Sequence, residues 1–508
     1  MAQRYWWNGW SGMDLDVVLV NPGSRRDVYQ GLGEEFSAIE PPSLAALFAT
    51  YLRRRGQSVE MIDAPAMNWG PAEVAGAVAY LNPVLVVLVV YGFQPSASTQ
   101  NMDCANETAR EIRKQAPQAK IIFTGTHPAA LPRRTLVDEP AIDFVCDGEG
   151  PRTITQLVPF LKAERADFGL VPGLWYRMGD MILSSPGASL LLEETLNTEM
   201  AGGAWDLLPM KRYRAHNWHA FENIEDRQPY ASIHTSLGCP YRCTFCCINA
   251  PFGKSSYRMW SPDCVIEELD LLVHKYGVRN VKFVDEMFVL NRAHVLGICD
   301  RIKDRGLGDS LNIWAYARVD TVKDEFLDRL RESGFRWLAL GIESASKHVR
   351  DGVEKGRFGS EEILKVVRKV QAAGINVIGN YIFGLPDDTD ESMRDTLSLA
   401  KEANCEFANF YSAMAYPGSK LYTLALEKGW RLPERWIGYS QHSYDTTPLP
   451  TQTLTGAEVL AFRDNAFREY FYSQSYVDMV RRKFGEGVVE NIGRMLSHKM
   501  PRRLLEVA

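Results

Sequence analysis

Apolar runs alternate with helical patterns along the first 160 residues. The run at 16–23 (DVVLVNPG) predicts a short buried strand, and Ser43 is expected to cap the helix that follows and that Gly56 ends. That helix is indicated by apolar residues at helical spacing, namely Leu44, Leu47, Phe48, Tyr51 and Leu52. Further strand-like runs are VEMIDA, VLVVLVVYG, KIIFTGTHP and IDFVCDGEGP, with a helical stretch over 107–116. This alternation predicts an α/β domain over 1–160 with a parallel, doubly wound sheet.

Small residues dominate the loops after these strands. They are Gly23, Gly92, Ser96, Ser98, Gly125, Thr126, Gly148 and Gly150. Tyr91 precedes Gly92 and His127 follows Thr126 in the same loops. Ligands of Rossmann-like sheets bind beyond the carboxyl ends of the strands, and glycine lets a ligand approach backbone N–H groups. We therefore expect a ligand site here, although most doubly wound folds have glycines at such positions.

Residues 161–230 follow a different pattern. LWYRMGDMILS predicts a hairpin that turns at Gly179-Asp180, and the remainder is irregular and rich in Pro, Tyr and Trp. We interpret this stretch as a connector packed between two domains.

Residues 231–430 return to regular alternation. Strand-like runs end near Leu237, Asp285, Arg318, Glu343, Phe383 and Ala415, with a helical pattern after each. Ser261 is expected to cap the first of these helices, with Pro262 at its first position and Gly277 at its end. About six units fall short of the eight of a full barrel, so the sequence predicts a partial (β/α)6 barrel.

Polar residues stand at the strand ends of this barrel, where the chemistry of such folds gathers. They are Asp285, Glu286, Arg318, Asp320, Glu343, Ser344 and Asn380. Helix caps or solvated loop charges are the alternative for some of them. The tail at 431–508 has helical periodicity and scattered aromatics, which predict a helical cap over the barrel mouth or a purely structural appendage.

The composition of the chain argues against several classes of partner and location. The chain has 46% hydrophobic and 24% charged residues with a net charge of −6, so a nucleic-acid partner is not expected. The longest apolar run, 84–91, is far shorter than the roughly 20 residues that cross a bilayer. The segment 1–12 lacks the basic and apolar regions of a signal peptide. We expect a cytoplasmic protein without a membrane span.

Four of the nine cysteines lie within 239–247. Cys239, Cys243 and Cys246 follow the order Cys-x-x-x-Cys-x-x-Cys directly after the first barrel strand, where a loop can wrap three thiolates around one centre. Structural zinc takes four ligands, and no second Cys or His pair stands nearby at a suitable spacing. Iron–sulfur clusters normally take four thiolates, so three would leave an iron open for catalysis. Cys247 is interpreted as a bystander, and inert buried thiols are the remaining alternative.

The three-cysteine spacing, with Phe245 before the last cysteine, resembles the signature of radical S-adenosylmethionine enzymes. The fold of that family is a partial barrel. The resemblance implies a catalytic 4Fe-4S cluster on Cys239, Cys243 and Cys246, whose open iron is chelated by S-adenosylmethionine. One electron would cleave that ligand to a 5′-deoxyadenosyl radical, which abstracts hydrogen from the substrate.

Further segments of the family can be matched residue by residue. FVDEMF is similar to the segment that contacts the methionine amino group, through Asp285 or Glu286. ARVD supplies Arg318 for the methionine carboxylate or the substrate, and GIES supplies Glu343, which resembles the residue that holds the ribose hydroxyls. VIGNYIFGLP, which contains Asn380, matches the segment that lines the adenine, and AYPGSKL resembles the end of the sixth strand. A structural ion pair is the alternative role for each.

A doubly wound domain ahead of such a barrel resembles the cobalamin-binding branch of this family, which includes the anaerobic magnesium-protoporphyrin ester cyclase and cobalamin-dependent C-methyltransferases. The match covers roughly 15–430 and implies cobalamin contacts from Tyr91, Gly92, Gly125, Thr126 and His127. One departure is that the chain lacks the Asp-x-His-x-x-Gly motif that supplies the lower cobalt ligand in other corrinoid proteins. We interpret His127 as a loop-shaping or tail-contacting residue rather than a cobalt ligand.

The pairing of the two domains predicts a cobalamin-dependent radical C-methyltransferase that acts on an unactivated carbon of a small metabolite. One S-adenosylmethionine would remethylate cobalamin and a second would generate the radical. Cyclisation, ring contraction or oxidation without methyl transfer is the alternative among enzymes, and a non-catalytic corrinoid or redox sensor is the alternative among binding proteins. The expected partners are the small-molecule substrate and an electron donor such as flavodoxin or ferredoxin, and a monomer is expected.

Overall fold

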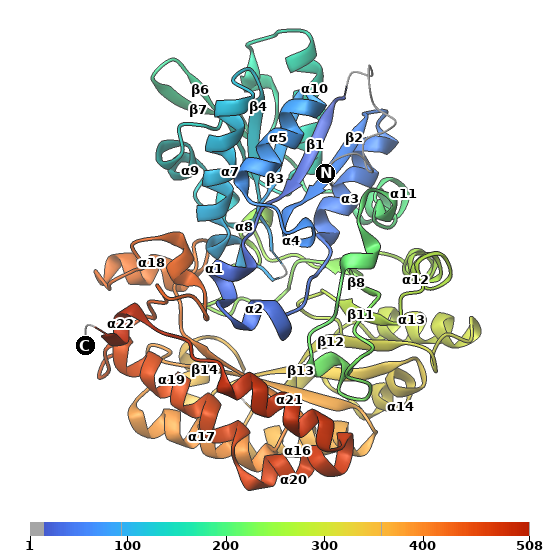
Figure 1. The fold of residues 1–508 in the computed structure, drawn as a ribbon, viewed down its shortest axis with the longest axis vertical. Coiled ribbons are helices and arrows are strands. Elements are labelled where there is room, and N and C mark those ends of the chain that lie inside the picture. The colour runs from blue at the N-terminus through green and yellow to red at the C-terminus, as the bar shows by residue number, and fades with distance from the viewer. Residues whose placement is uncertain (1–14, 93, 357, 507–508) are drawn as a thin grey trace.

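The structure, a computed structural model, describes residues 15–92, 94–356 and 358–506. The segment 1–12, considered above as a signal peptide, lies outside the described residues. Figure 1 shows one sheet with its helices in the upper half of the molecule and a second sheet with its helices in the lower half.

The first sheet has the predicted doubly wound core. Within the described chain it contains seven strands in the order β2-β1-β3-β4-β5-β6-β7. The parallel strands are β1 (Val17–Asn21), β2 (Val59–Asp63), β3 (Leu85–Val89), β4 (Lys120–Thr124) and β5 (Phe144–Cys146). Every residue of β1 and β3 is buried, as expected for strands covered on both faces.

Helices cover the two faces of this sheet. The helices are α3 (Ser43–Arg54), α5 (Pro71–Leu81), α7 (Met102–Gln115) and α10 (Pro151–Lys162). Alternate residues of β1 pack with α3 and α10 on one face and with α5 and α7 on the other. The expected cap at Ser43 is wrong by one position. Pro42 occupies the cap, and the Ser43 hydroxyl instead lies 3.2 Å from Nδ1 of His234.

The predicted hairpin forms, but it belongs to the first sheet and not to a separate connector. Strands β6 (Leu174–Met178) and β7 (Met181–Ser184) turn at Gly179-Asp180. Strand β6 pairs antiparallel with β5 and so covers the edge of the parallel sheet.

The second sheet is the predicted partial barrel. Its six parallel strands among the described residues follow the order β15-β14-β13-β12-β11-β8. The strands are β8 (Tyr230–Ile233), β11 (Asn280–Phe283), β12 (Asn312–Arg318), β13 (Phe335–Glu343), β14 (Asn376–Phe383) and β15 (Phe407–Ser412). The outer helices are α12 (Pro262–Tyr276), α13 (Arg292–Asp304), α14 (Asp324–Glu332), α16 (Ser360–Ala372), α17 (Asp390–Ala403) and α18 (Lys420–Glu427).

Several predicted boundaries of this barrel are confirmed. Strands β12, β13 and β14 end at the predicted residues, and Ser261 caps α12 by accepting a hydrogen bond from the Cys264 backbone N–H. The first strand ends at Ile233, before the predicted Leu237, because the Thr235 backbone N–H turns to Oδ1 of Asp285 at 2.6 Å. Strands β11 and β15 likewise end two or three residues before Asp285 and Ala415.

An aromatic floor closes the amino-terminal end of the barrel. Trp218, from the stretch between the sheets, lies with its ring centroid 5.1 Å from that of Trp314, 5.5 Å from that of Trp337 and 5.7 Å from that of Phe407. The opposite end, at the carboxyl ends of the strands, faces the first sheet (Figure 1).

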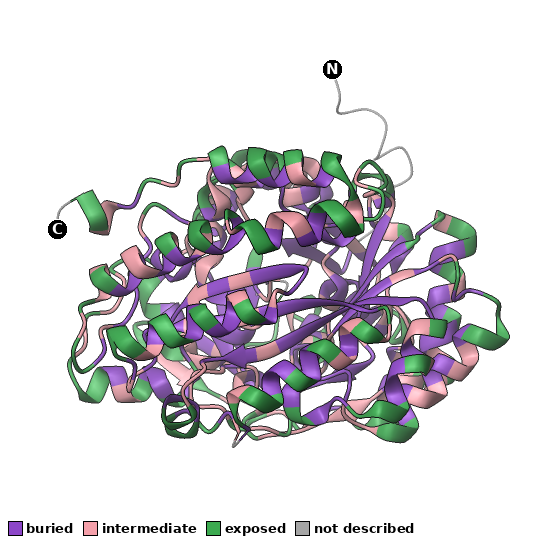
Figure 2. Ribbon diagram, turned by 90° about the horizontal axis from the view of Figure 1, so that it is seen from below, coloured by how far each residue is buried: buried purple, intermediate pink, exposed green. Residues whose placement is uncertain are grey.

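The C-terminal helices cover the free edge of β15. They are α19 (Gly456–Phe471), α20 (Gln474–Phe484) and α21 (Glu486–Ser497), in the lower half of Figure 1. The hydroxyls of Tyr470 and Tyr476 donate to the carbonyls of Cys405 and Glu406, next to the start of β15. In Figure 2 the strands are buried at the centre and the helices turn exposed faces outward.

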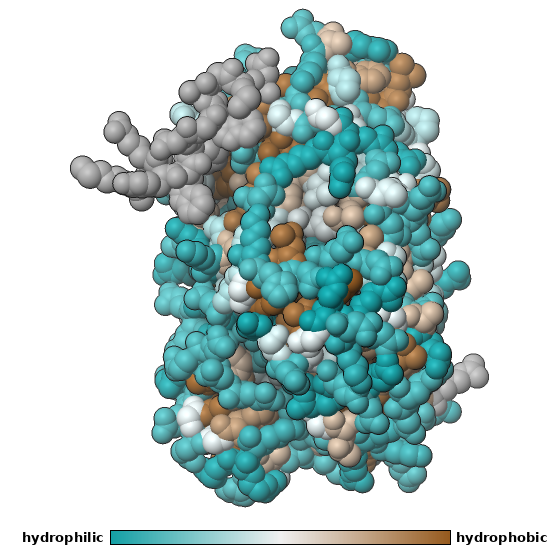
Figure 3. Space-filling view, turned by 90° about the vertical axis from the view of Figure 1, so that its right-hand side faces the viewer, coloured by the Kyte–Doolittle hydropathy of each residue, from teal (hydrophilic) through white to brown (hydrophobic). Residues whose placement is uncertain are grey.

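The surface is mainly hydrophilic on the face drawn in Figure 3, where hydrophobic side chains form separate patches. Over the described residues, no helix combines the length and the apolar character that crossing a bilayer requires.

Candidate active site

A hollow of about 230 Å³, called here the chamber, lies at the carboxyl ends of the barrel strands beneath the first sheet. It brings together most of the predicted barrel residues: Cys239, Cys243, Cys246, Glu286, Arg318, Glu343 and Asn380. The loop after β3 closes it from above with Gln94, Pro95 and Ser96. Residues from both halves of the chain therefore face one space.

The three motif cysteines lie in the loop after the short strand β9 (Ser236–Leu237). Gly238 begins this loop at φ +84°, where a Cβ would meet the Ser256 carbonyl oxygen at 2.5 Å. All three thiols are free. Burial raises the pKa of the Cys239 thiol to about 11 and that of Cys246 well above its usual value, and the nearby Cys243 raises both further. Adjacent buried thiols of this kind ionise when a cationic centre binds them.

These thiols fit an iron–sulfur cluster by their donor chemistry. Within the part of the chain that the structure describes, no group of three His, Cys, Asp or Glu side chains is arranged to hold a metal ion. In a cluster each thiolate binds a different iron atom, so its ligands surround a larger volume than a single ion does. Cys247 is buried and also lines the chamber.

Arg318 stands beside Cys243 at the end of β12. Its Nη1 donates to Sγ of Cys243 at 3.6 Å. Its guanidinium pairs with Asp320, Nε to Oδ1 at 2.9 Å, and stacks 3.9 Å from the ring centroid of Tyr241. These contacts hold a cation at the edge of the cysteine loop.

Glu343 lies at the end of β13 in a left-handed conformation, with φ +65°. Such a conformation is costly for a residue other than glycine and is found where a side chain must be aimed at a site. Its Oε1 lies 2.5 Å from Nζ of Lys355, and both side chains line the chamber. Asn380 accepts a hydrogen bond from Asn409 at 3.0 Å and also lines the chamber.

The two adjacent carboxylates on the β11 loop differ in availability. Asp285 is 2% exposed, and its oxygens accept hydrogen bonds from the Thr235 backbone N–H, the Thr235 hydroxyl and the Ser236 hydroxyl. Glu286 lines the chamber, and burial raises its pKa to about 7. The structure therefore leaves Glu286 as the carboxylate that can receive a ligand.

A smaller hollow of about 60 Å³ continues from the chamber between the two sheets. Tyr91, Gly92 and Thr126 line it from the first sheet, and Asp285 and Glu286 line it from the second. A Cβ on Gly92 would meet the Cβ of Ala97 at 2.6 Å. The predicted ligand loops of the first sheet thus face the barrel.

Gly125 and His127 are not among the residues that line either hollow. A Cβ on Gly125 would lie 2.0 Å from the Val90 carbonyl oxygen, so this glycine lets the β4 loop pack against the end of β3. Nδ1 of His127 lies 3.2 Å from the Thr99 hydroxyl, and its ring lies 4.4 Å from that of Trp436. Burial lowers its pKa to about 3. These contacts hold His127 inside the loop.

Several polar residues of the chamber were not predicted from the sequence, among them Tyr316, Lys355, Tyr411 and Gln441. Tyr316 could have been found, because it lies two residues before Arg318 on β12 and so shares its face. Lys355 and Gln441 come from loops whose paths no local pattern indicates.

Two family models match the chain. The radical SAM superfamily matches 233–400 and the B12 binding domain matches 29–158. An uncharacterized methyltransferase from Pyrococcus horikoshii is 29% identical over 84% of this chain and 86% of the relative. An anaerobic magnesium-protoporphyrin IX monomethyl ester cyclase from Cereibacter sphaeroides is 25% identical over 91% of this chain and 71% of the relative.

Solved structures share the fold. The radical S-adenosylmethionine methyltransferase TsrM from Kitasatospora setae, solved with cobalamin and a [4Fe-4S] cluster, superposes with a TM-score of 0.63. It is 21% identical, and the match covers 82% of this chain and 75% of TsrM.

Proposed function

The chain belongs to the cobalamin-binding radical S-adenosylmethionine enzymes, and from this membership we propose that it methylates an unactivated carbon of a small molecule. One observation carries the proposal. Three free thiols and the polar ends of the barrel strands share a chamber with the ligand loop of the first sheet. Relatives named as methyltransferases support methyl transfer.

The chamber residues divide among the cofactors by their chemistry. Cys239, Cys243 and Cys246 would hold a 4Fe-4S cluster. Glu286 would accept hydrogen bonds from the amino group of S-adenosylmethionine, and Arg318 would face its carboxylate. When bound, the cluster supplies an electron to S-adenosylmethionine and cobalamin supplies a transferable methyl group.

The chain itself orients these groups and excludes water. Asp285 fixes the turn at 235–236 that leads into the cysteine loop. Lys355 holds the Glu343 carboxylate at the chamber wall, where it would meet the ribose hydroxyls, and Asn380 would lie along the adenine. The buried position of Glu286 keeps its carboxyl partly protonated near pH 7 until a cation approaches.

Cobalamin would lie between the two sheets, against Tyr91, Gly92 and Thr126. Gly125 and His127 would act indirectly and without touching cobalamin, because they fix the shape of the β4 loop. His127 is turned toward Thr99 and Trp436, so we assign it no bond to cobalt.

The experiment is anaerobic reconstitution with iron, sulfide and cobalamin, followed by S-adenosylmethionine, a reductant and candidate metabolites. Methylation predicts both 5′-deoxyadenosine and S-adenosylhomocysteine, and a product heavier by one methylene unit. Formation of 5′-deoxyadenosine without S-adenosylhomocysteine would favour cyclisation or oxidation, as in the relative named as a cyclase. A protein that binds no S-adenosylmethionine would instead be a corrinoid or redox sensor.

We also propose that the enzyme works in the reducing cytoplasm with flavodoxin or ferredoxin as electron donor, and as a monomer. All nine cysteines are free, which suits a reducing compartment. Both walls of the chamber come from one chain. Size-exclusion chromatography and reduction by purified flavodoxin test these assignments.

A further inference from the structure

Two C-terminal side chains bind the free edge of β15, the outermost strand of the barrel sheet. Nε of Arg463 donates to the Phe410 carbonyl at 2.7 Å. The Gln441 carboxamide pairs with both backbone groups of Ser412, at 2.8 and 2.9 Å. Tyr411 lies between these two anchor points, and Tyr411 and Gln441 both line the chamber. Arg463 is therefore fixed directly behind the chamber wall.

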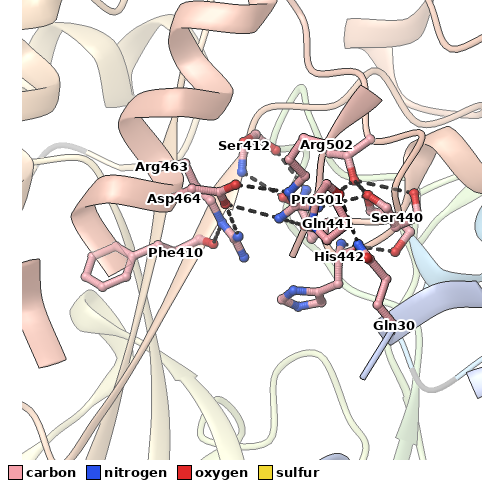
Figure 4. A network of polar contacts seen from close by, with 12 residues as sticks. Gln30, Phe410, Ser412, Ser440, Gln441, His442, Arg463, Asp464, Pro501 and Arg502 are labelled. Atoms are coloured by element: carbon pink, nitrogen blue, oxygen red, sulfur yellow. Dashed lines mark hydrogen bonds and ion pairs between the residues drawn. The ribbon is translucent and has the colours of Figure 1, made fainter. Parts of the chain in front are cut away.

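This corner of the molecule carries an unbalanced positive charge. Arg463 and Arg502 are 2% and 3% exposed, and both guanidiniums bind Asp464 (Figure 4). No second carboxylate of the described chain lies within ion-pair distance of either guanidinium. The remaining bonds of Arg502 go to neutral oxygens of Gln441, Ser443 and Thr446. Burying a net charge without a counter-ion is costly.

One donor of this pair of guanidiniums is left without a partner in the described part of the chain. Nη2 of Arg463 has no hydrogen-bond partner among the described residues, whereas Nε and Nη1 each have one. Figure 4 shows the Arg463 guanidinium and the His442 ring pointing to the same side of the network. Nδ1 of His442 is buried and, within the described chain, makes no hydrogen bond.

His442 does not add to the charge. Its ring lies 5.6 Å from that of Tyr29, and burial lowers its pKa well below the usual value, with Arg463 and Arg502 lowering it further. Tyr411 directly follows Phe410, whose carbonyl accepts the Arg463 hydrogen bond, and burial raises the pKa of the Tyr411 phenol. A neutral imidazole and a phenol can each donate one hydrogen bond to an anion beside the guanidinium.

We propose that Arg463 and His442, which lie behind the β15 wall of the chamber, form with the chamber residue Tyr411 an anion-binding subsite that holds a carboxylate or phosphate group of the substrate. This rests on the proposed function, because it treats the chamber as the substrate site. The anion would neutralise the shared charge of Arg463 and Arg502 and take the donors that Asp464 leaves unused. Arg318, next to the cysteine loop, is a separate cation and is assigned to S-adenosylmethionine.

The test is anion binding by the fully reconstituted enzyme. The thermal unfolding midpoint is measured against sodium phosphate and against sodium acetate, each compared with sodium chloride at equal ionic strength. A ligand of the folded state raises the midpoint saturably. We expect such a rise for phosphate, acetate or both, and the tighter probe identifies the group that the substrate carries.

Matched variants locate the binding. Arg463→Gln should weaken the binding of the probe about tenfold or more, which is the size expected for losing a hydrogen bond to a charged group. Arg468→Gln removes an exposed charge from the same helix and should leave the binding unchanged. Tyr411→Phe keeps the Arg463 anchors and should weaken the binding less. Asp464→Asn adds one net positive charge and should tighten the binding.

The sign of the Asp464→Asn effect separates electrostatics from damage to the fold. The subsite is overturned if wild-type enzyme responds equally to all three salts, if Arg463→Gln keeps the response, or if Asp464→Asn weakens it as Arg463→Gln does. S-adenosylhomocysteine formation is measured in parallel. Methylation without any anion response would contradict only the proposed subsite. An anion response without methylation would contradict only the proposed reaction.

Discussion

At the scale of single residues, availability decides which polar groups can act. Asp285 and Glu286 are neighbours with the same chemistry, yet Asp285 already accepts three hydrogen bonds from residues 235 and 236, and Glu286 faces both hollows. A buried acceptor with its donors in place serves the fold, and a buried carboxyl beside an open space is ready for a cationic ligand.

Substitution of these two neighbours should therefore have opposite consequences. Asp285→Asn replaces one acceptor oxygen with a donor and should lower the free energy of unfolding by about 1–3 kcal/mol. Glu286→Gln should leave stability unchanged or higher, because it removes a carboxyl that resists ionisation, and should weaken S-adenosylmethionine binding about tenfold. Urea unfolding and equilibrium dialysis on reconstituted enzyme measure the two effects. Loss of affinity in a fully stable Asp285→Asn variant would reverse the assignment.

The cysteine assignment is tested by a pair of neighbouring thiols. Cys243→Ala should lose the iron–sulfur absorbance at about 400 nm and most of the bound iron, because a thiolate ligand is missing. Cobalamin content should be retained, since Cys243 is absent from the hollow lined by Tyr91 and Thr126. Cys247→Ala is the control, because Cys247 lines the chamber without belonging to the motif. Iron retained in the first variant and lost in the second would contradict the ligand set.

The sequence predicts residues of this site where the signal is local. Cys239, Cys243 and Cys246 follow from spacing, and Arg318 and Glu343 follow from their places at strand ends. The sequence does not show whether Asp285 or Glu286 is free to bind a ligand, because the Thr235 hydroxyl that binds Asp285 lies fifty residues away in the chain. Gln441 reaches the chamber because a loop passes the free edge of β15, and no local pattern encodes that path.

At the scale of elements, the way in which the edges of the two sheets are covered could not be predicted without the tertiary structure. The parallel strands alternate with helices and were predictable, because their hydrophobic runs are long and regular. The hairpin β6–β7 was found in sequence, but its pairing with β5 was not. The free edge of β15 is satisfied by side chains of the C-terminal region instead of by a seventh strand. Open edges must be covered, and the means of covering them vary.

A buried carboxylate joins the connector to the barrel helix α12 and should make stability depend on pH. Glu268 is 8% exposed, and its Oε1 accepts hydrogen bonds from the Gly203 backbone N–H at 2.7 Å and from Nε1 of Trp205 at 2.9 Å. Burial raises its pKa from 4.5 to about 7. The folded state thus holds the proton more tightly than the unfolded state does.

The sign follows from linkage. The contribution of Glu268 to the free energy of unfolding is fully present below pH 4.5 and is lost as pH rises through about 7. The whole change amounts to roughly 3 kcal/mol. Glu268→Gln cannot ionise, so its free energy of unfolding relative to wild type should rise by about three quarters of that amount between pH 5 and pH 8. Unfolding midpoints of both proteins at the two pH values give this difference. A difference independent of pH would show that the carboxyl is already ionised at pH 5.

At the scale of the whole molecule, the loop before α19 ties the two sheets together. The Ile437 backbone N–H donates to Oδ2 of Asp103, and Nε2 of Gln30 donates to the His442 carbonyl. Trp436 packs against His127 and lies under the guanidinium of Arg134, at 4.7 Å. A chamber built from both sheets keeps its shape only while this attachment holds, since its upper wall comes from the loop after β3.

Trp436→Ala should therefore loosen the upper wall while leaving the barrel intact. Trp436 is half-buried, so the loss is expected to be roughly 2 kcal/mol, below that for a fully buried tryptophan. Hydrogen exchange should rise in 97–103 and 126–131, which lie beside the lost ring, and stay unchanged in β13 and β14. Bound cobalamin should dissociate faster, because its proposed site lies between the sheets.

Tyr472→Ala, at a side chain that is 61% exposed, is the control. Exchange that rises equally in both sheets would mean that Trp436 supports the whole fold, and unchanged exchange would mean that the other contacts of this loop suffice to hold the sheets together.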